Sequence, residues 1–164
     1  MPEKETLERA KKDKREGKAA STQAGEFVRE EIHHVREGKH GARSTKQAIA
    51  IGLSKARRAG VKLPPPEEGT ASEETRHSAE RAYEKGQHGN GGVSRTRSQA
   101  TRAALKKEGH SAASRTALSK QAKSAAKKRT AAERSAAAKK AARTKGPAKR
   151  SAAAKKAART RAKH

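Results

Sequence analysis

The residues of this 164-residue chain best suited to chemistry are lysines and arginines near its C-terminal end. The eleven-residue string RSAAAKKAART occupies residues 134–144 and, without substitution, residues 150–160. In each copy two lysines and an arginine are spaced i, i+1, i+4, which places them on one side of a helix. Such a cluster can neutralise phosphates but has no group that makes or breaks covalent bonds. The pattern predicts binding to a polyanion rather than catalysis.

We predict that these cations follow the phosphate backbone of a nucleic acid. Alanine favours the helix, whereas repulsion between like charges opposes it until phosphates neutralise them, so we expect the helices to form on binding. Contacts with phosphates distinguish poorly between base sequences. The predicted nucleic-acid-binding residues are Lys127, Lys128, Arg129, Arg134, Lys139, Lys140, Arg143, Lys149, Arg150, Lys155, Lys156 and Arg159.

Histidines and carboxylates are the other residues that could do chemistry. His33 and His34 are adjacent and point apart by about 100° on a helix. Glu30 with His34, and His33 with Glu37, form i,i+4 pairs, and His40 could approach from the following turn. A closed zinc site needs about four converging ligands, and the sequence does not specify that convergence. We predict surface salt bridges here, with no metal site and no cofactor.

Enzymatic motifs are missing from the sequence, which has no P-loop, no GxSxG and no HExxH. The absence of cysteine excludes disulfides and thiol catalysis and suits a reducing compartment. The N-terminus lacks the apolar stretch of a secretory signal, and no run approaches the ~20 apolar residues of a membrane span. We predict a non-catalytic, cytoplasmic protein without catalytic residues.

The net charge of +25 is distributed unevenly along the chain. Residues 1–92 hold 19 Lys/Arg and 15 Asp/Glu, whereas residues 93–164 hold 23 and 2. Only fifteen side chains are large and apolar, and nine of them lie between residues 27 and 63. Burial of each contributes about 2 kcal/mol, whereas ordering each residue costs about 1–2 kcal/mol. We therefore expect one small folded unit and disorder over much of the remainder.

Helical periodicity and capping residues predict an all-α fold. Ser21 or Thr22 is the expected N-cap of a helix over 22–37, and Ser44 with Gln47 fits a capping box for a helix ending at Gly60. Further helices are expected at 3–16, 73–85 (capped by Ser72 and closed by Gly86), 96–108, 111–145 and 149–162. The predicted organisation is a charged N-terminal helix (1–20), a helical hairpin unit (21–66), a linker with a short helix and a Gly-rich loop (67–92), and a partly disordered basic arm (93–164).

A second, weaker repetition links the hairpin to the arm. Residues 37–53 and 85–105 share Gly-x-His-Gly, a basic and hydroxyl cluster, and a Gln-Ala pair six residues before a leucine. Residues 107–122 are a looser third copy. Apolar residues decrease and charge increases from copy to copy. We interpret this as one helix–turn–helix unit repeated with loss of its core, with chance similarity of composition as the alternative.

Two stretches resemble known families. The tail, SAAAKKAARTKGPAKRSAAAKKAART within residues 111–164, resembles the Ala/Lys-rich arms of bacterial linker-histone-like proteins. Residues 21–66, with GKHG and STKQAIAIGLSKARRAG, resemble a family of small basic proteins from Gram-negative bacteria that are uncharacterised or loosely called DNA-binding. That family has no established active residues to transfer. Together the resemblances imply a nucleoid-associated or stress-related accessory protein of bacteria.

The function expected from the sequence is sequence-tolerant binding of duplex DNA, with compaction or bridging. Aromatic residues are limited to Phe27 and Tyr83, which disfavours base stacking on single strands. Binding to RNA or the ribosome is the main alternative. A second alternative is a protein-interaction adaptor, in which residues 21–63 pair with a second copy or another protein. Membrane binding is disfavoured because the tail has no bulky apolar face.

Overall fold

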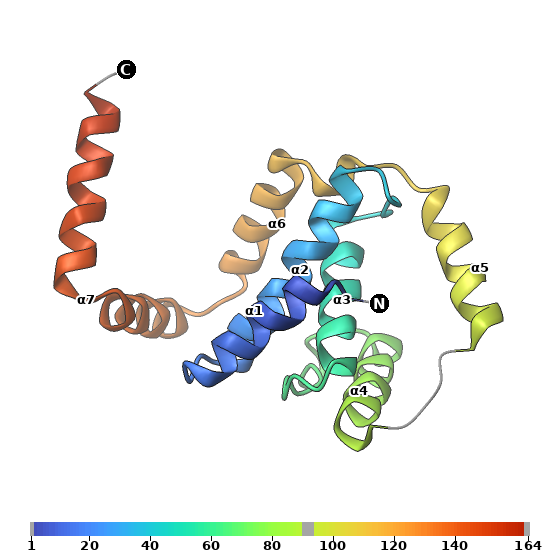
Figure 1. Cartoon of the computed structure of the whole chain (residues 1–164). Coiled ribbons are helices and arrows are strands. Elements are labelled where there is room, and N and C mark those ends of the chain that lie inside the picture. Colours follow the sequence, from blue (N-terminus) through green and yellow to red (C-terminus); the bar gives the residue numbers. More distant parts are fainter. Residues whose placement is uncertain (1, 90–93, 163–164) are drawn as a thin grey trace. The chain divides into compact units, whose positions relative to one another are not determined.

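A computed structural model describes residues 2–89 and 94–162. The expected all-α class is confirmed, because the described residues form α-helices and one 3₁₀ turn and include no strand (Figure 1). The elements are α1 (Lys4–Arg15), α2 (Ala20–Arg36), α3 (Thr45–Arg58), α4 (Glu73–His88), α5 (Arg95–Lys106), η1 (Ser111–Ala113), α6 (Arg115–Lys127) and α7 (Ala131–Arg161). None of the described helices combines the length and apolar character that crossing a membrane requires.

The chain divides into two compact units, unit 1 (Met1–Gln121) and unit 2 (Ala122–His164). The division lies well beyond residue 93, where the basic arm was expected to begin. The physical reason is the packing of η1 against α2 and α3, which joins this part of the chain to the first helices. The structure does not confirm partial disorder after residue 93, since residues 95–106, 115–127 and 131–161 are helical.

The centre of unit 1 is the antiparallel pair α2 and α3. Ala48, Gly52 and Ala56 recur every four residues and form the buried stripe of α3. A Cβ added to Gly52 would lie 2.7 Å from Val28 Cα, so only glycine permits this approach of the two backbones. The expected stripe of Ile49, Leu53 and Ala56 is therefore only partly correct, because Ile49 remains half exposed.

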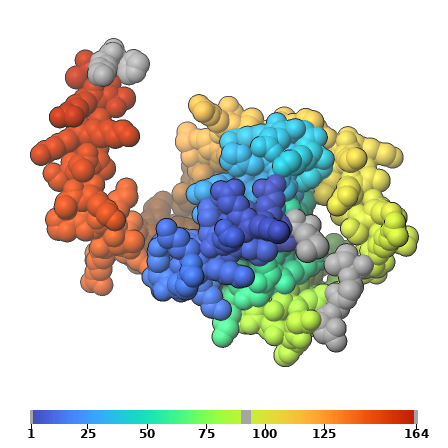
Figure 2. All heavy atoms as spheres, in the orientation of Figure 1, coloured from blue at the N-terminus to red at the C-terminus, as the bar shows by residue number. Residues whose placement is uncertain are grey.

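Two small apolar clusters lie along this helix pair, one toward each end. The first surrounds Phe27 and Ala24, both 0% exposed, and includes Ala10 of α1. In the space-filling view α1 covers part of α2 (Figure 2). The second cluster contains Ile32 and Val35 together with smaller residues of α3 and η1. The core is thus built largely from alanines placed around a few larger side chains.

Residues 105–113 are tied to the hairpin by polar contacts as well as by burial. Gly41 N–H donates to Leu105 O (2.9 Å) and Ala42 N–H donates to Gly109 O (3.0 Å). Two further bonds reach η1 from side chains: Thr45 Oγ1 donates to Ala112 O (2.7 Å) and Arg36 Nε donates to Ala113 O (2.8 Å). Ala112 and Ala113 are buried. The third sequence copy therefore contributes to the core although it has almost no large apolar residue.

Helix α4 continues past Gly86, where it was expected to end. It reaches His88 and is terminated by Gly89 in the left-handed conformation (φ 65°). A Cβ on Gly86 would lie 1.8 Å from Arg57 O, so this glycine provides close contact between α4 and the end of α3 rather than a helix stop. Ser72 caps α4 as predicted, accepting from Thr75 N–H.

Buried Arg57 fixes the chain after α3. Its Nε donates to Leu63 O (3.1 Å) and its Nη2 donates to Pro64 O (3.0 Å). Burial lowers the pKa of the Arg57 guanidinium, which nevertheless keeps its charge because arginine is protonated at any physiological pH. The arginine therefore serves the fold and is unavailable to a phosphate.

The N-cap predicted from the sequence is confirmed at Ser44, whereas the N-cap predicted for α2 is not observed. Ser44 Oγ accepts from Gln47 N–H, whereas Gln47 Oε1 accepts from Arg43 N–H, one residue before the N-cap of the predicted capping box. Helix α2 begins at Ala20 with Ala19 as an N-cap that makes no side-chain hydrogen bond. The cap expected at Ser21 or Thr22 is wrong, because Ala20 already packs against the cluster around Phe27.

Candidate nucleic-acid interface

The twelve cations predicted to bind nucleic acid lie at the end of α6, in the turn after it and along α7. All twelve are exposed. Lys127 ends α6, Lys128 and Arg129 occupy the turn, and the other nine lie on α7. The structure places them along one continuous segment of the chain.

The continuous helix predicted over 111–145 is interrupted at this turn. Thr130 and Glu133 form a capping box that starts α7: Thr130 N–H donates to Glu133 Oε2 (2.7 Å) and Glu133 N–H donates to Thr130 Oγ1 (3.2 Å). These bonds from the Thr130 backbone and hydroxyl lower the pKa of Glu133. The only acidic residue of unit 2 is therefore used to begin the cationic helix, where negative charge also suits the helix dipole.

The two RSAAAKKAART copies have the same local structure. In the first copy Thr144 Oγ1 donates to Lys140 O (2.9 Å), and in the second Thr160 Oγ1 donates to Lys156 O (3.0 Å). The predicted break between them is confirmed at Gly146, whose φ of 67° and ψ of 167° lie outside the helical region. Such backbone angles are open almost only to glycine. Unit 2 thus presents two equivalent cationic helical segments.

Within the part of the chain that the structure describes, the charges of these segments have no acidic partners. Unit 2 holds sixteen Lys/Arg and one Glu. Within the described residues 94–162 no lysine or arginine forms an ion pair, whereas several of those in residues 2–89 do. Unpaired surface cations need not break an existing ion pair to contact a phosphate, so no such energetic cost opposes polyanion binding by this segment.

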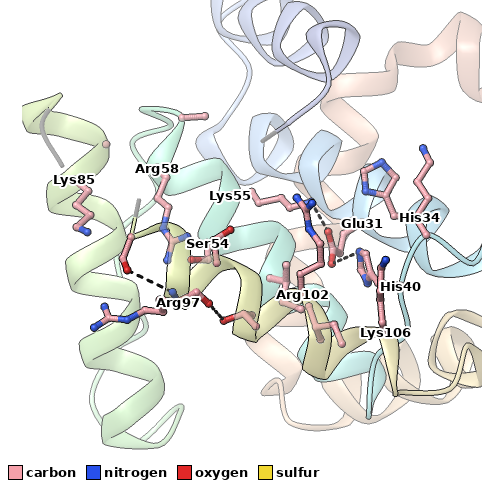
Figure 3. A pocket seen from close by; sticks show the side chains of 18 of the residues that line it. Glu31, His34, His40, Ser54, Lys55, Arg58, Lys85, Arg97, Arg102 and Lys106 are labelled. Atoms are coloured by element: carbon pink, nitrogen blue, oxygen red, sulfur yellow. Dashed lines mark hydrogen bonds and ion pairs between the residues drawn. The ribbon is translucent and has the colours of Figure 1, made fainter. Parts of the chain in front are cut away.

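Unit 1 contains a second basic surface that the sequence analysis did not single out. An open groove of about 980 Å³ is lined by residues from α2, α3, α4 and α5 and from the turn after α2 (Figure 3). Its cations include Arg58, Lys85, Arg97, Arg102 and Lys106, none of which forms an ion pair with a described residue. Glu31 is the only acidic residue in the lining.

Two other cations of the groove are already engaged. Lys39 pairs with Glu37 and Glu3, each at 3.1 Å, and these hydrogen bonds raise the pKa of Lys39. Lys55 Nζ lies 2.6 Å from Glu31 Oε2. The groove therefore offers five free cations. The sequence carried a signal for three of them in the predicted cationic helix 96–108, but nothing in it placed this helix opposite Arg58 and Lys85.

Comparison with known proteins adds one finding. Residues 11–67 match the model of a family of unknown function (DUF6496). The match extends over α2 and α3 and contains the stretch 21–66 that resembles an uncharacterised family. It does not reach η1, the groove cations of α4 and α5, or unit 2. No curated protein and no solved structure matches the chain.

Proposed function

We propose that this protein binds duplex DNA without catalysis and without strong sequence preference, through phosphate contacts of unit 2. The observation that carries the proposal is the exposure of all twelve predicted cations, on helical segments with no acidic partner among the described residues. The described residues 122–162 hold fifteen cations, which corresponds to about one per 4 Å at the helical rise. Duplex DNA carries one negative charge per about 1.7 Å of axis, so the arm can neutralise many phosphates at once.

The positions of the aromatic residues favour backbone contact over base contact. Phe27 is 0% exposed in the core of unit 1, so it cannot stack on a base. Tyr83 is half-buried in α4, and the sequence of unit 2 has no aromatic residue. Proteins that hold single strands usually stack bases on aromatic side chains. This supports duplex binding and localisation to a bacterial nucleoid, in line with the linker-histone-like composition of the tail.

The groove of unit 1 would be a second, weaker contact with the same polyanion. Its five free cations face one open depression rather than covering a long helix. Replacing Arg58, Lys85, Arg97, Arg102 and Lys106 by glutamine should therefore weaken binding less than neutralising a similar number of cations in α7.

The test compares two glutamine variants of the full chain in gel shifts on a mixed-sequence duplex. The arm variant changes Lys139, Lys140, Arg143, Lys155, Lys156 and Arg159. The control changes six exposed cations of unit 1 that lie outside the groove and form no ion pair with a described residue: Lys4, Lys11, Lys14, Lys46, Lys62 and Arg81. Both variants lose the same net charge. We expect the arm variant to bind on the order of a hundredfold more weakly and the control to stay within a few fold.

Equal weakening of the two variants would show that net charge, rather than the arm, determines binding. An arm variant that binds like the parent would reject the proposal. A structured RNA of matched charge is titrated in parallel, and tighter binding to this RNA than to the duplex would replace the DNA assignment by RNA.

A further inference from the structure

One end of the groove contains three potential metal ligands that converge. Glu31 lies on α2, His34 one turn further along the same helix, and His40 in the turn that follows. One carboxylate oxygen of Glu31 and one ring nitrogen of each histidine all lie within 4.8 Å of one another. Figure 3 shows the Glu31 carboxylate between His40 and Lys55. From the sequence, Glu30 with His34 and an approach of His40 from the turn were considered and no metal site was expected; Glu31 was not among the candidates.

Glu31 is buried and lacks hydrogen-bond partners. Its side chain is 0% exposed, and neither carboxylate oxygen accepts a hydrogen bond. Lys55 Nζ lies 2.6 Å from Oε2, close enough to pair in charge but not in the direction of a hydrogen bond. A buried carboxylate of this kind is costly unless a cation completes its surroundings.

His40 presents a lone pair to this carboxylate. Its Nδ1 lies 3.0 Å from Gly41 O, and because a carbonyl only accepts, Nδ1 must carry a proton. In the neutral ring Nε2 is then an acceptor, and it lies 3.3 Å from Glu31 Oε1. Two acceptors facing each other need a positive centre between them, which either a metal ion or a second proton on His40 would supply. The bond from Nδ1 to a backbone carbonyl is also the usual way in which a metal-binding histidine is oriented.

His34 is held by the same kind of outer contact. Its Nε2 lies 2.9 Å from Glu3 Oε1, so Glu3 occupies the place of the carboxylate that commonly supports a ligating imidazole. The rings of His34 and His40 are 6.1 Å apart between centroids and nearly perpendicular. Ligands of one zinc ion lie about 3–4 Å apart, so the three donor atoms need only small side-chain rotations to meet at an ion.

The local charge balance favours a cation. Glu30 and Glu31 are 4% and 0% exposed, and among the described residues Lys55 is the one lysine or arginine paired with either, at 3.6 Å and 2.6 Å respectively. With His40 neutral, the two buried carboxylates share a single cation. Two imidazoles and one carboxylate, open toward a groove, form a ligand set suited to zinc and similar divalent transition ions.

We propose that Glu31, His34 and His40 bind a divalent transition-metal ion of the zinc class. The ion would join the end of α2 to the turn whose Gly41 and Ala42 hold residues 105 and 109. It would thereby stabilise one wall of the groove, a structural role that is independent of nucleic-acid binding.

The experiment is a competition titration of the metal-free full chain with Zn²⁺ and a chromophoric chelator. We expect one equivalent to bind, and His34→Ala and His40→Ala each to weaken binding by at least about tenfold. His33→Ala is the matched control, because His33 is adjacent but exposed and outside the cluster. It should bind like the parent. Circular dichroism confirms that each variant is folded.

A second measurement does not depend on variants. In the NMR spectrum of the parent chain, one equivalent of Zn²⁺ should shift the ring signals of His34 and His40 and leave those of His33 and His77 in place. The proposal is overturned if Zn²⁺ does not compete with the chelator, if binding survives in both the His34 and His40 variants, or if the ring shifts spread over all the histidines.

Discussion

Alanine has opposite roles in the two units. In unit 1, Ala24, Ala48, Ala56 and Ala113 are fully buried where helices or η1 meet. In α7 most alanines are exposed and none is buried, so they contribute helix propensity only. The same residue type therefore permits close packing in one unit and exposed, charged helical segments in the other. What separates the units is the presence of a few larger partners, such as Phe27 and Val35, around which alanine can pack.

The lysines and arginines of the two units also differ in whether other residues engage them. Cations of unit 1 are frequently paired or buried, as in Lys55 with Glu31 or Arg57 with the carbonyl oxygens of Leu63 and Pro64. Cations of unit 2 have no such partners among the described residues. Lysine and arginine content alone therefore does not locate a binding surface, because part of that content stabilises the fold.

The largest change expected from a single substitution concerns packing in unit 1. Gly52→Ala would place a Cβ 2.7 Å from Val28 Cα, and overpacking of this kind destabilises by roughly 1–3 kcal/mol. The matched control is Gly25→Ala in α2, where a Cβ meets nothing within 4 Å. That variant should stabilise by about 0.5–1 kcal/mol, because alanine favours the helix over glycine.

Urea unfolding followed by Tyr83 fluorescence measures this contrast, since Tyr83 is the only tyrosine, lies in α4, and the chain has no tryptophan. Opposite signs for the two variants are expected. If Gly52→Ala stabilises unit 1 as much as Gly25→Ala does, the close contact between α2 and α3 is not present in solution.

A smaller effect is expected at the start of α7. Removing the cap by Thr130→Ala should destabilise the helix by about 1 kcal/mol. The capping bonds lower the pKa of Glu133 in the helix. The helix therefore has their full stabilisation above the unfolded-state pKa and loses it as the pH falls through the lower, folded-state pKa.

Backbone chemical shifts of residues 131–136 measure both effects, over a pH series from neutral to below 4. Glu133→Gln is the control, because it removes the titrating group. Its helix start should be insensitive to pH in the acidic range. A parent chain whose residues 131–136 show no loss of helix at acid pH would contradict the capping arrangement.

The sequence predicted the helices well where capping and periodicity coincide and poorly where small residues decide the contacts. Ser44, Ser72 and Gly146 were correctly placed at helix boundaries because their backbone roles are local. Gly86 was misinterpreted as a helix stop, because its role depends on Arg57, which is distant in sequence.

The candidate sites also differ in how far they could be predicted from local sequence. The arm could be predicted because its chemistry lies in composition and repetition. The groove could not, because it requires helices from separate parts of the chain to converge. Glu31 was missed because no sequence pattern fixes the path of the turn that brings His40 to it. Counting only large apolar residues also underestimated the folded unit, since Ala112 and Ala113 add buried surface without entering such a count.

The salt dependence of duplex binding by the full chain and the two six-glutamine variants tests whether unit 2 is the electrostatic interface. If the arm neutralises roughly ten phosphates, log K should fall against log salt with a slope near −9. The arm variant should lose about 5 units of that slope, and the unit 1 control should keep nearly all of it. A shallow slope for the parent chain, or the same loss in both variants, would contradict an electrostatic interface located in unit 2.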